Sequence, residues 1–187
     1  MSRRLTIGWG ALVTSLVVAL GCCAGAIKAF AGESSQYEVE AAYLYKFAPF
    51  VDWPSSVFTS AQSPIYLCIV GDDPFGSTID RFVSGQFDGQ RPIEVRRLRR
   101  ARADSACQIM FVSGSDVQSV AEALDAVAGE PILTATDADS GPSGIIHFVI
   151  ENQRVRFDID QDAADESGII ISSKLLSLAR SVKRAKG

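Results

Sequence analysis

PIYLCIVGDDPFG, residues 64–76, is an apolar run rich in isoleucine, valine and tyrosine that ends at Gly71 in turn-forming residues. Because polar residues do not alternate within the run, it is typical of a strand buried on both faces of a sheet. The segment 76–85 follows as a short helix that Gly85 closes. A buried strand followed directly by a helix predicts a sheet with helices on its faces.

The segments that follow extend this pattern. Residues 115–130 predict a helix, in which Ser115 and Gln118 have the spacing of a capping box. Strands and helices that alternate along a chain are typical of a largely parallel sheet. The further strands of this part are expected at residues 91–98, 107–113 and 131–137.

The C-terminal part has a different pattern. Two strand-like runs within residues 144–160 flank a polar turn at 151–153, which indicates an antiparallel hairpin. Residues 167–184 predict a short apolar strand or turn, then a helix that Ser172 or Ser173 caps. The basic residues expected at the C-terminus of this helix are Arg180, Lys183 and Arg184. The fold class is therefore α/β: a single-domain sandwich with a mostly parallel central sheet, an antiparallel C-terminal hairpin and helices on the faces.

An aromatic helix is expected before the first buried strand. Residues 34–54, SSQYEVEAAYLYKFAPFVDWP, repeat apolar residues at steps of three and four, and Ser35 with Glu38 has capping-box spacing. Pro49 lacks the N–H that a continued helix needs, so we expect the helix to kink or end close to Ala48.

The first 31 residues have the composition of a secretory signal peptide, with a basic start, an apolar run too short to span a membrane and a small-residue cleavage site. Lipoprotein processing at Cys22 is the alternative, although Leu20 stands where a small or β-branched residue is usual. The domain is thus expected at residues 32–187, in the periplasm. Residues 1–31 contain three basic and no acidic residues, so the charge falls from −4 to −7 without them. An acidic domain argues against nucleic-acid binding.

The loop after the first buried strand resembles a phosphate-binding loop in its glycine spacing. In GDDPFGST, residues 71–78, Ser77 stands where lysine is required, and two aspartates would repel phosphate. A plain strand-to-helix turn explains the loop better. A small-ligand crevice at the carboxyl ends of the strands is the alternative. Its rim would include Gly71, Asp72, Asp73 and Ser113.

Two further patterns fail as metal or catalytic sites. Asp158, Asp160 and Asp162 have calcium-loop spacing, but Ala163 and Ile169 replace the required glycine and glutamate. His147 is the only histidine, and no ligand or activating motif accompanies it. We therefore expect no metal, no cofactor and no enzymatic activity.

A basic cluster and a cysteine pair remain. Arg96, Arg97 and Arg99 belong to RRLRRARAD, which is either a solvated loop or a surface that docks on acidic protein or lipid. Cys68 and Cys107 are the cysteines left after residue 31, and an isolated pair in an oxidising compartment indicates one disulfide. Such a bond either only stabilises the fold or, alternatively, lets the redox state control whether the protein is able to function.

The chain resembles the YfiR-like family of exported bacterial proteins. The resemblance rests on five segments in this order and spacing: YEVEAAYLYKFAPFVDWP, LCIVGDDPFG, CQIMFVS, VRFDID and GIIISSKLLSLA. The resemblance extends from Tyr37 to Val182 and implies an α/β sandwich that dimerises in the periplasm. It implies that Cys68 and Cys107 match the commoner cysteine pair of the family. A second pair has no counterpart here, and Pro49 departs from the polar residue that is usual in the family.

The resemblance also implies a function. The chain is expected to bind and repress the periplasmic domain of an inner-membrane signalling protein, in particular a diguanylate cyclase that makes cyclic di-GMP. The alternative is a periplasmic small-ligand-binding module that serves a histidine kinase or a transport system. The expected partner or dimer surface contains Tyr43, Phe47, Phe50 and Trp53 together with the arginines of the basic cluster.

Overall fold

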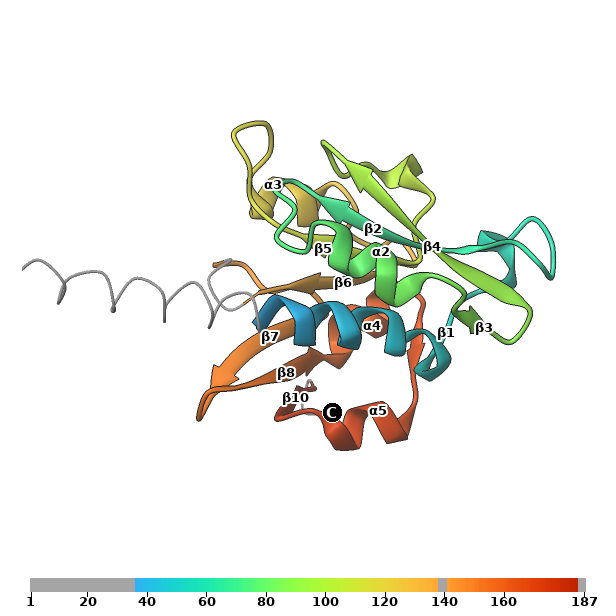
Figure 1. The fold of residues 1–187 in the computed structure, drawn as a ribbon. Helices are drawn as coiled ribbons and strands as arrows, with labels where there is room; N and C mark the ends of the chain where they lie inside the picture. Colours follow the sequence, from blue (N-terminus) through green and yellow to red (C-terminus); the bar gives the residue numbers. More distant parts are fainter. Residues whose placement is uncertain (1–35, 138–140, 185–187) are drawn as a thin grey trace, which may run out of the picture. The chain divides into compact units, whose positions relative to one another are not determined.

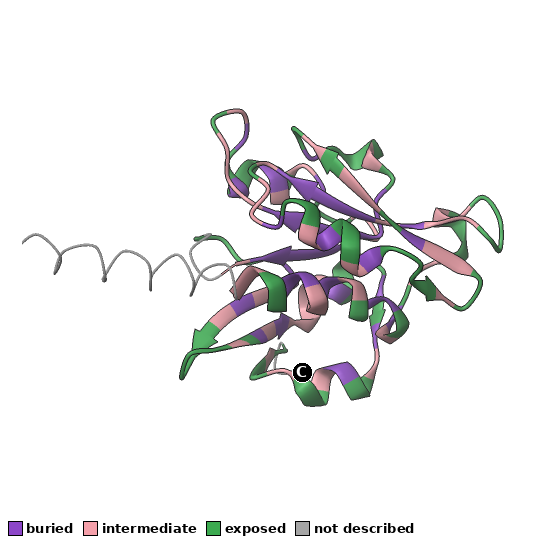
Figure 2. Ribbon diagram, in the orientation of Figure 1, coloured by how far each residue is buried: buried purple, intermediate pink, exposed green. Residues whose placement is uncertain are grey.

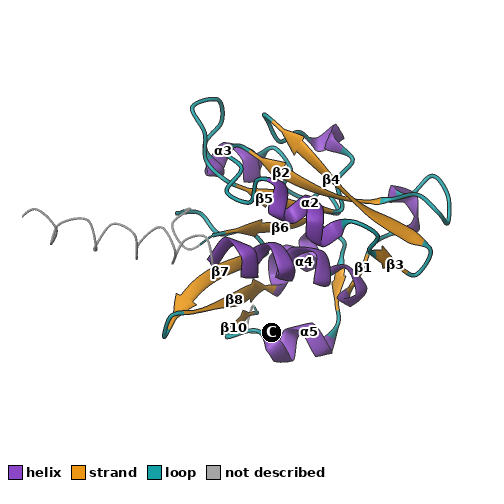
Figure 3. Cartoon of the chain, viewed as in Figure 1, coloured by secondary structure: helices purple, strands orange, loops and turns teal. Residues whose placement is uncertain are grey.

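An eight-stranded sheet forms the centre of the computed structural model, which describes residues 36–137 and 141–184 (Figures 1 and 3). Its strand order is β10-β8-β7-β6-β5-β2-β4-β3. The strands are β2 (Ile65–Val70), β3 (Phe87–Asp88), β4 (Arg91–Leu98), β5 (Ile109–Val112), β6 (Leu133–Thr136), β7 (Ile146–Glu151), β8 (Arg154–Asp160) and β10 (Ser181–Lys183). A separate two-stranded sheet pairs β1 (Val51–Asp52) with β9 (Ile170–Ile171).

The central strands are parallel, as the sequence predicts. Strand β2 pairs in parallel with both β4 and β5, and β5, β6 and β7 continue in parallel. The hairpin β7–β8 is antiparallel, and its turn places Asn152 and Gln153 at φ of 50° and 61°. Positive φ at both turn residues is what a tight two-residue hairpin requires. The expected fold class is confirmed.

Helices cover both faces of the sheet. They are the first helix (residues 36–46), α2 (Ser77–Val83), α3 (Val120–Asp125), α4 (Gln161–Glu166) and α5 (Ser173–Leu178), with 3-10 turns η1 (Ala48–Phe50), η2 (Ser55–Val57) and η3 (Ala103–Ser105).

Alternate residues of β2 divide the core between the two faces. Leu67 and Ile69 belong to the larger cluster, which includes apolar residues of the first helix, α2, α4 and α5. Cys68 and Val70 point the other way into a smaller cluster that contains the buried residues of α3. Both faces of β2 are therefore buried, which explains its unbroken apolar sequence (Figure 2).

Pro49 ends the first helix, as expected. The α-helix stops at residue 46, and Pro49 lies in the first turn of η1, where a missing N–H costs no hydrogen bond. Its expected capping residue, Ser35, and the whole signal segment lie outside the described residues.

Two local predictions were wrong. Helix α3 begins after Ser119, which forms the capping box with Glu122, whereas Ser115 accepts from the amides of Val117 and Gln118 in the preceding turn. The last helix, α5, ends at Leu178, and the chain continues as β10 beside β8. Of the basic residues expected at a helix C-terminus, Arg180 and Lys183 therefore pair with the carboxylates of Asp158 and Asp160, and Arg184 donates to the side-chain oxygen of Gln161.

Candidate functional site

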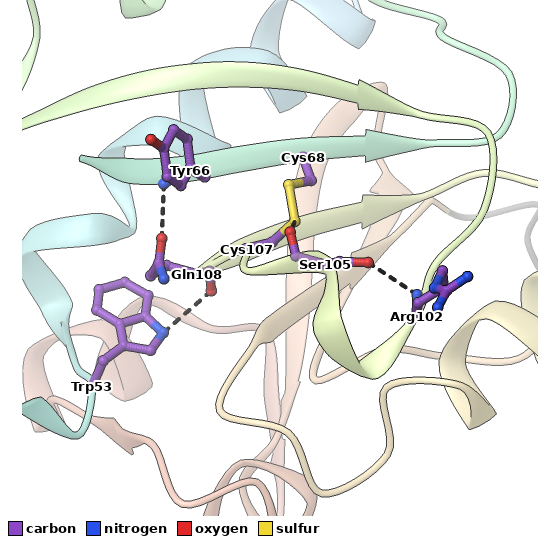
Figure 4. Close-up of a disulfide and its surroundings, with 7 residues drawn as sticks. All are labelled: Trp53, Tyr66, Cys68, Arg102, Ser105, Cys107 and Gln108. Carbon is purple, nitrogen blue, oxygen red and sulfur yellow. Dashed lines mark hydrogen bonds between the residues drawn. A yellow bond between two sulfur atoms is a disulfide. The ribbon is translucent and has the colours of Figure 1, made fainter. Parts of the chain in front are cut away.

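A disulfide joins Cys68 of β2 to Cys107, two residues before β5 (Figure 4). The Cα atoms are 6.0 Å apart, and the bond links positions 39 residues apart in the chain. Both side chains are buried within the smaller core cluster. The cysteine pairing expected from the sequence is thus confirmed, and the bond fixes the loop 99–106 to the central strand of the sheet.

Gln108, next to Cys107, is a buried polar residue that forms hydrogen bonds with two other segments of the chain (Figure 4). Its side-chain oxygen accepts a hydrogen bond from the Tyr66 amide at 2.9 Å, and its own amide donates to the Tyr66 carbonyl at 3.0 Å. Its carbonyl accepts from the indole N–H of Trp53 at 3.2 Å. The half-buried Trp53 ring is therefore tied to the residue beside the disulfide. Sequence reasoning missed Gln108, although a lone polar residue between Cys107 and an apolar strand was a usable signal.

The short sheet β1–β9 carries the clearest exposed apolar surface. Ile170 is 65 % exposed and lies opposite Asp52, while their neighbours in the two strands face the core. The carbonyl of Phe50 accepts from the Ser172 amide at 2.9 Å, and the Lys174 ammonium lies 5.4 Å from the Phe50 ring centre. We call Phe50, Asp52, Ile170 and Lys174 the β1–β9 surface. It unites the N-terminal aromatic segment with the C-terminal serine-lysine-leucine segment.

A shallow groove of about 250 Å³ lies beside this surface. Trp53 and Phe58 form part of its wall, and the guanidinium of Arg91 stacks 3.6 Å from the Phe58 ring centre. Trp53 is half-buried, so its ring is accessible from this side.

The other expected surface aromatics lie deeper. Phe47 is 2 % exposed, and its ring packs against those of Phe148 and Phe157 at 6.2 and 5.2 Å. Tyr43 is half-buried and packs against Phe47 at 5.9 Å. Phe47 therefore belongs to the core of the described chain, because the helical face that carries it covers the sheet.

The arginines of the basic cluster differ in their contacts. Arg97 of β4 binds Asp73 at 2.7 Å and Asp80 at 2.6 Å, and it donates to the Gly76 carbonyl. Its hydrogen bond lowers the pKa of Asp80, and the two carboxylates raise the pKa of Arg97. Arg97 thus anchors helix α2 to the sheet.

The neighbouring arginines behave differently. The Arg96 guanidinium lies 3.1 Å from the Tyr66 ring centre, in a cation–π arrangement. Arg99, after the end of β4, is exposed and forms no salt bridge with another described residue.

The strand ends are occupied by the protein's own contacts. Asp73 accepts hydrogen bonds from the amides of Phe75 and Gly76, which forms the turn into α2. Gly71 has φ of 87°, and a Cβ atom there would lie 2.0 Å from the Ser113 carbonyl oxygen. The structure therefore brings Gly71 and Ser113 together, with Asp72 exposed beside them. The contacts of this loop are those of a strand-to-helix turn.

The remaining candidates have local partners. Thr136 Oγ1 and His147 Nδ1 are 3.1 Å apart, and Asp158 forms a salt bridge with Arg180 that lowers the Asp158 pKa. Asp160 caps α4 and binds Lys183 at 2.6 Å. Residues 36–137 and 141–184 contain no cluster of three histidine, cysteine or carboxylate side chains able to hold a metal ion.

Within the same part of the chain, no helix combines the length and the apolar character needed to cross a membrane. The candidate site consists of three surfaces: the β1–β9 surface, the groove beside Trp53 and the arginine-bearing edge of β4.

No curated protein matches the chain. A family model described as YfiR/HmsC-like matches residues 37–180, which include the disulfide, both strands of the β1–β9 surface and every strand of the eight-stranded sheet except β10. This match covers most of the chain and agrees with the α/β architecture. The protein therefore belongs to the YfiR/HmsC-like family.

Proposed function

We propose that the protein is a non-enzymatic regulator that binds the periplasmic domain of an inner-membrane signalling protein and represses it. The partner we propose is a diguanylate cyclase, so that the protein lowers cyclic di-GMP. Membership of the YfiR/HmsC-like family over residues 37–180 supports a regulatory role in the periplasm.

The exposure of Ile170 is the observation that carries this proposal. Its side chain is 65 % exposed although backbone pairing with β1 holds it in place. Asp52 and Lys174 place opposite charges around Ile170 and Phe50. Apolar side chains at the centre and charged groups at the rim are the usual anatomy of a protein–protein interface. A partner that covers Ile170 removes this apolar area from water.

The test compares Ile170→Asp with Phe87→Asp. Phe87 is a matched control because it is 62 % exposed and lies on β3, at the edge of the other sheet. Each variant is produced in cells that lack the native gene, and cyclic di-GMP is measured together with capture of the cyclase by a tagged regulator. We expect Ile170→Asp to lose capture and to raise cyclic di-GMP, and Phe87→Asp to behave like the wild type.

Thermal unfolding of both variants verifies that folding is intact, since each substitution changes an exposed side chain. Deletion of the gene without any change in cyclic di-GMP, together with failure of the wild type to capture a cyclase, contradicts the proposal. Unchanged capture of the cyclase by Ile170→Asp excludes the β1–β9 surface as the binding site.

A further inference from the structure

Strand β4 has a long open edge. It pairs with β2 along Ile93–Leu98, but β3, its outer neighbour, pairs only with Arg91 and Pro92. Figure 2 shows β4 as mostly half-buried and exposed residues beside the mostly buried β2. Open edges are sites where another extended chain can add a strand.

The hydrogen bonds at the two ends of β4 identify the groups that point outward. The Ile93 amide donates to the Gln86 carbonyl on the β3 side, and the Leu98 carbonyl accepts from the Gly71 amide on the β2 side. Backbone groups alternate in direction along a strand, and the register is unbroken from Ile93 to Leu98. The N–H and C=O groups of Val95 and Arg97 therefore point away from β2. No described residue forms a main-chain hydrogen bond with them.

The charge around this edge is positive, although the whole chain has a net charge of −4. Glu94 is the one acidic residue of β4, while Arg96 and Arg97 lie within the strand and Arg99 and Arg100 follow it. Arg97 is neutralised by two aspartates. Neither Arg99 nor Arg100 forms a salt bridge with another described residue. Arg100 acts electrostatically on the Glu122 carboxylate, so the Arg99 guanidinium is the group available to carboxylates of an added strand.

A second copy of this chain is a poor occupant of the edge. If two β4 strands paired antiparallel about Val95, Arg97 of one copy would have to lie opposite Ile93 of the other, where Gln86 already lies. Pairing about Arg97 would bring together two arginines that Asp73 and Asp80 already neutralise, so charge does not oppose that register. Pairing about Arg96 would place two Arg96 side chains opposite each other, neither of which forms a salt bridge with another described residue, and like charges opposite each other destabilise a sheet. The arginines without salt bridges favour an acidic chain over a second copy.

We propose that the outer edge of β4, at Glu94–Leu98, accepts an extended acidic segment of a partner protein as an additional strand. Main-chain bonds to Val95 and Arg97 hold the segment, and Arg99, which follows β4, selects its charge. The inference goes beyond the proposed function because it concerns a surface separate from β1–β9. It stands if Ile170→Asp has no effect.

The test removes one outward N–H and leaves the sheet intact. Val95→Pro removes the N–H that faces solvent and leaves every hydrogen bond between β2 and β4 in place. Proline is tolerated at such edge positions. Val95→Thr is the matched control because it keeps the N–H and the β-branched shape. The probe is the acetylated, amidated peptide Glu-Val-Glu-Val-Glu-Val-Glu, and its comparison is the same peptide with lysine in place of glutamate.

Binding is followed in the 15N-labelled protein by amide chemical shifts and hydrogen exchange during titration with each peptide. We expect the acidic peptide to slow exchange at Val95 and Arg97 about tenfold or more at millimolar concentration, with no binding by the lysine peptide. Val95→Pro is expected to weaken binding by about two- to tenfold, and Val95→Thr to bind like the wild type.

Equal binding of the two peptides, or unchanged binding by Val95→Pro, overturns the proposal. Absence of any chemical-shift change with either peptide also overturns it, because the edge then does not accept an added strand. If the wild type is a dimer and Val95→Pro is a monomer, the edge binds a second copy of the chain. That result overturns the proposal of an acidic partner.

Discussion

The disulfide makes a quantitative prediction about stability. Cys68 and Cys107 are 39 residues apart, and closing a loop of that length in the unfolded chain corresponds to about 4 kcal/mol on the chain-entropy model. A change of 1 kcal/mol shifts the Tm of a domain of this size by about 2–4 °C. Reduction, or the double substitution Cys68→Ala with Cys107→Ala, is therefore expected to lower Tm by about 8–16 °C.

The assay is thermal unfolding followed by circular dichroism, with and without a phosphine reductant. The double alanine variant is the control for the reductant, because its Tm is expected to be the same in both conditions. A fall of less than about 2 °C on reduction of the wild type refutes the reasoning. It would mean that the unfolded chain gains little freedom when this loop opens.

Three further predictions concern single side chains. Gly71→Ala places a Cβ atom 2.0 Å from a carbonyl oxygen and is expected to lower the free energy of unfolding in urea by about 2–4 kcal/mol. In the control Gly85→Ala the new Cβ has no atom within 4 Å, and the expected loss is about 1 kcal/mol. Equal losses in the two variants would contradict this. Ser119→Ala removes the capping box of α3 and is expected to cost about 1 kcal/mol by the same assay; an unchanged midpoint would place the helix start elsewhere. Arg97→Met is expected to lose about 0.5–1 kcal/mol at pH 7, because solvent screens the pair. Arg97 lowers the pKa of Asp80 below its unfolded value, so this stability exists above about pH 4 and disappears as Asp80 protonates at lower pH. A deficit that persists at pH 2 would show that the ion pair is not its source.

The central strands β2, β5 and β6 could be predicted from the sequence because their burial on both faces imposes an apolar composition. The first buried run became β2, and the run after Cys107 became β5, as expected. Pro49 ended the first helix for a reason that is local to the backbone. Such features depend on residues close in sequence, which a single sequence displays directly.

The features that could not be predicted depend on residues far apart. Residues 181–183 follow a helix and carry basic side chains, so they looked like its continuation, but parallel pairing with β8 and contacts with Asp158 and Asp160 favour a strand. Arg97 looked like a surface charge because its partners, Asp73 and Asp80, come from another loop and helix. Phe47 was assigned to the surface because the broad apolar arc of its helix did not reveal which side the sheet covers.

The pairing of β1 with β9 also sets the time at which the β1–β9 surface becomes complete. Val51 pairs with Ile171, so the ribosome makes the second residue about 120 positions after the first. At usual elongation rates this interval is about 6–24 s. Until then Phe50 has no C-terminal neighbour, and a chain cut before residue 170 lacks half of this surface. The protein is therefore unable to present its β1–β9 surface during synthesis, and binding through it is restricted to finished molecules.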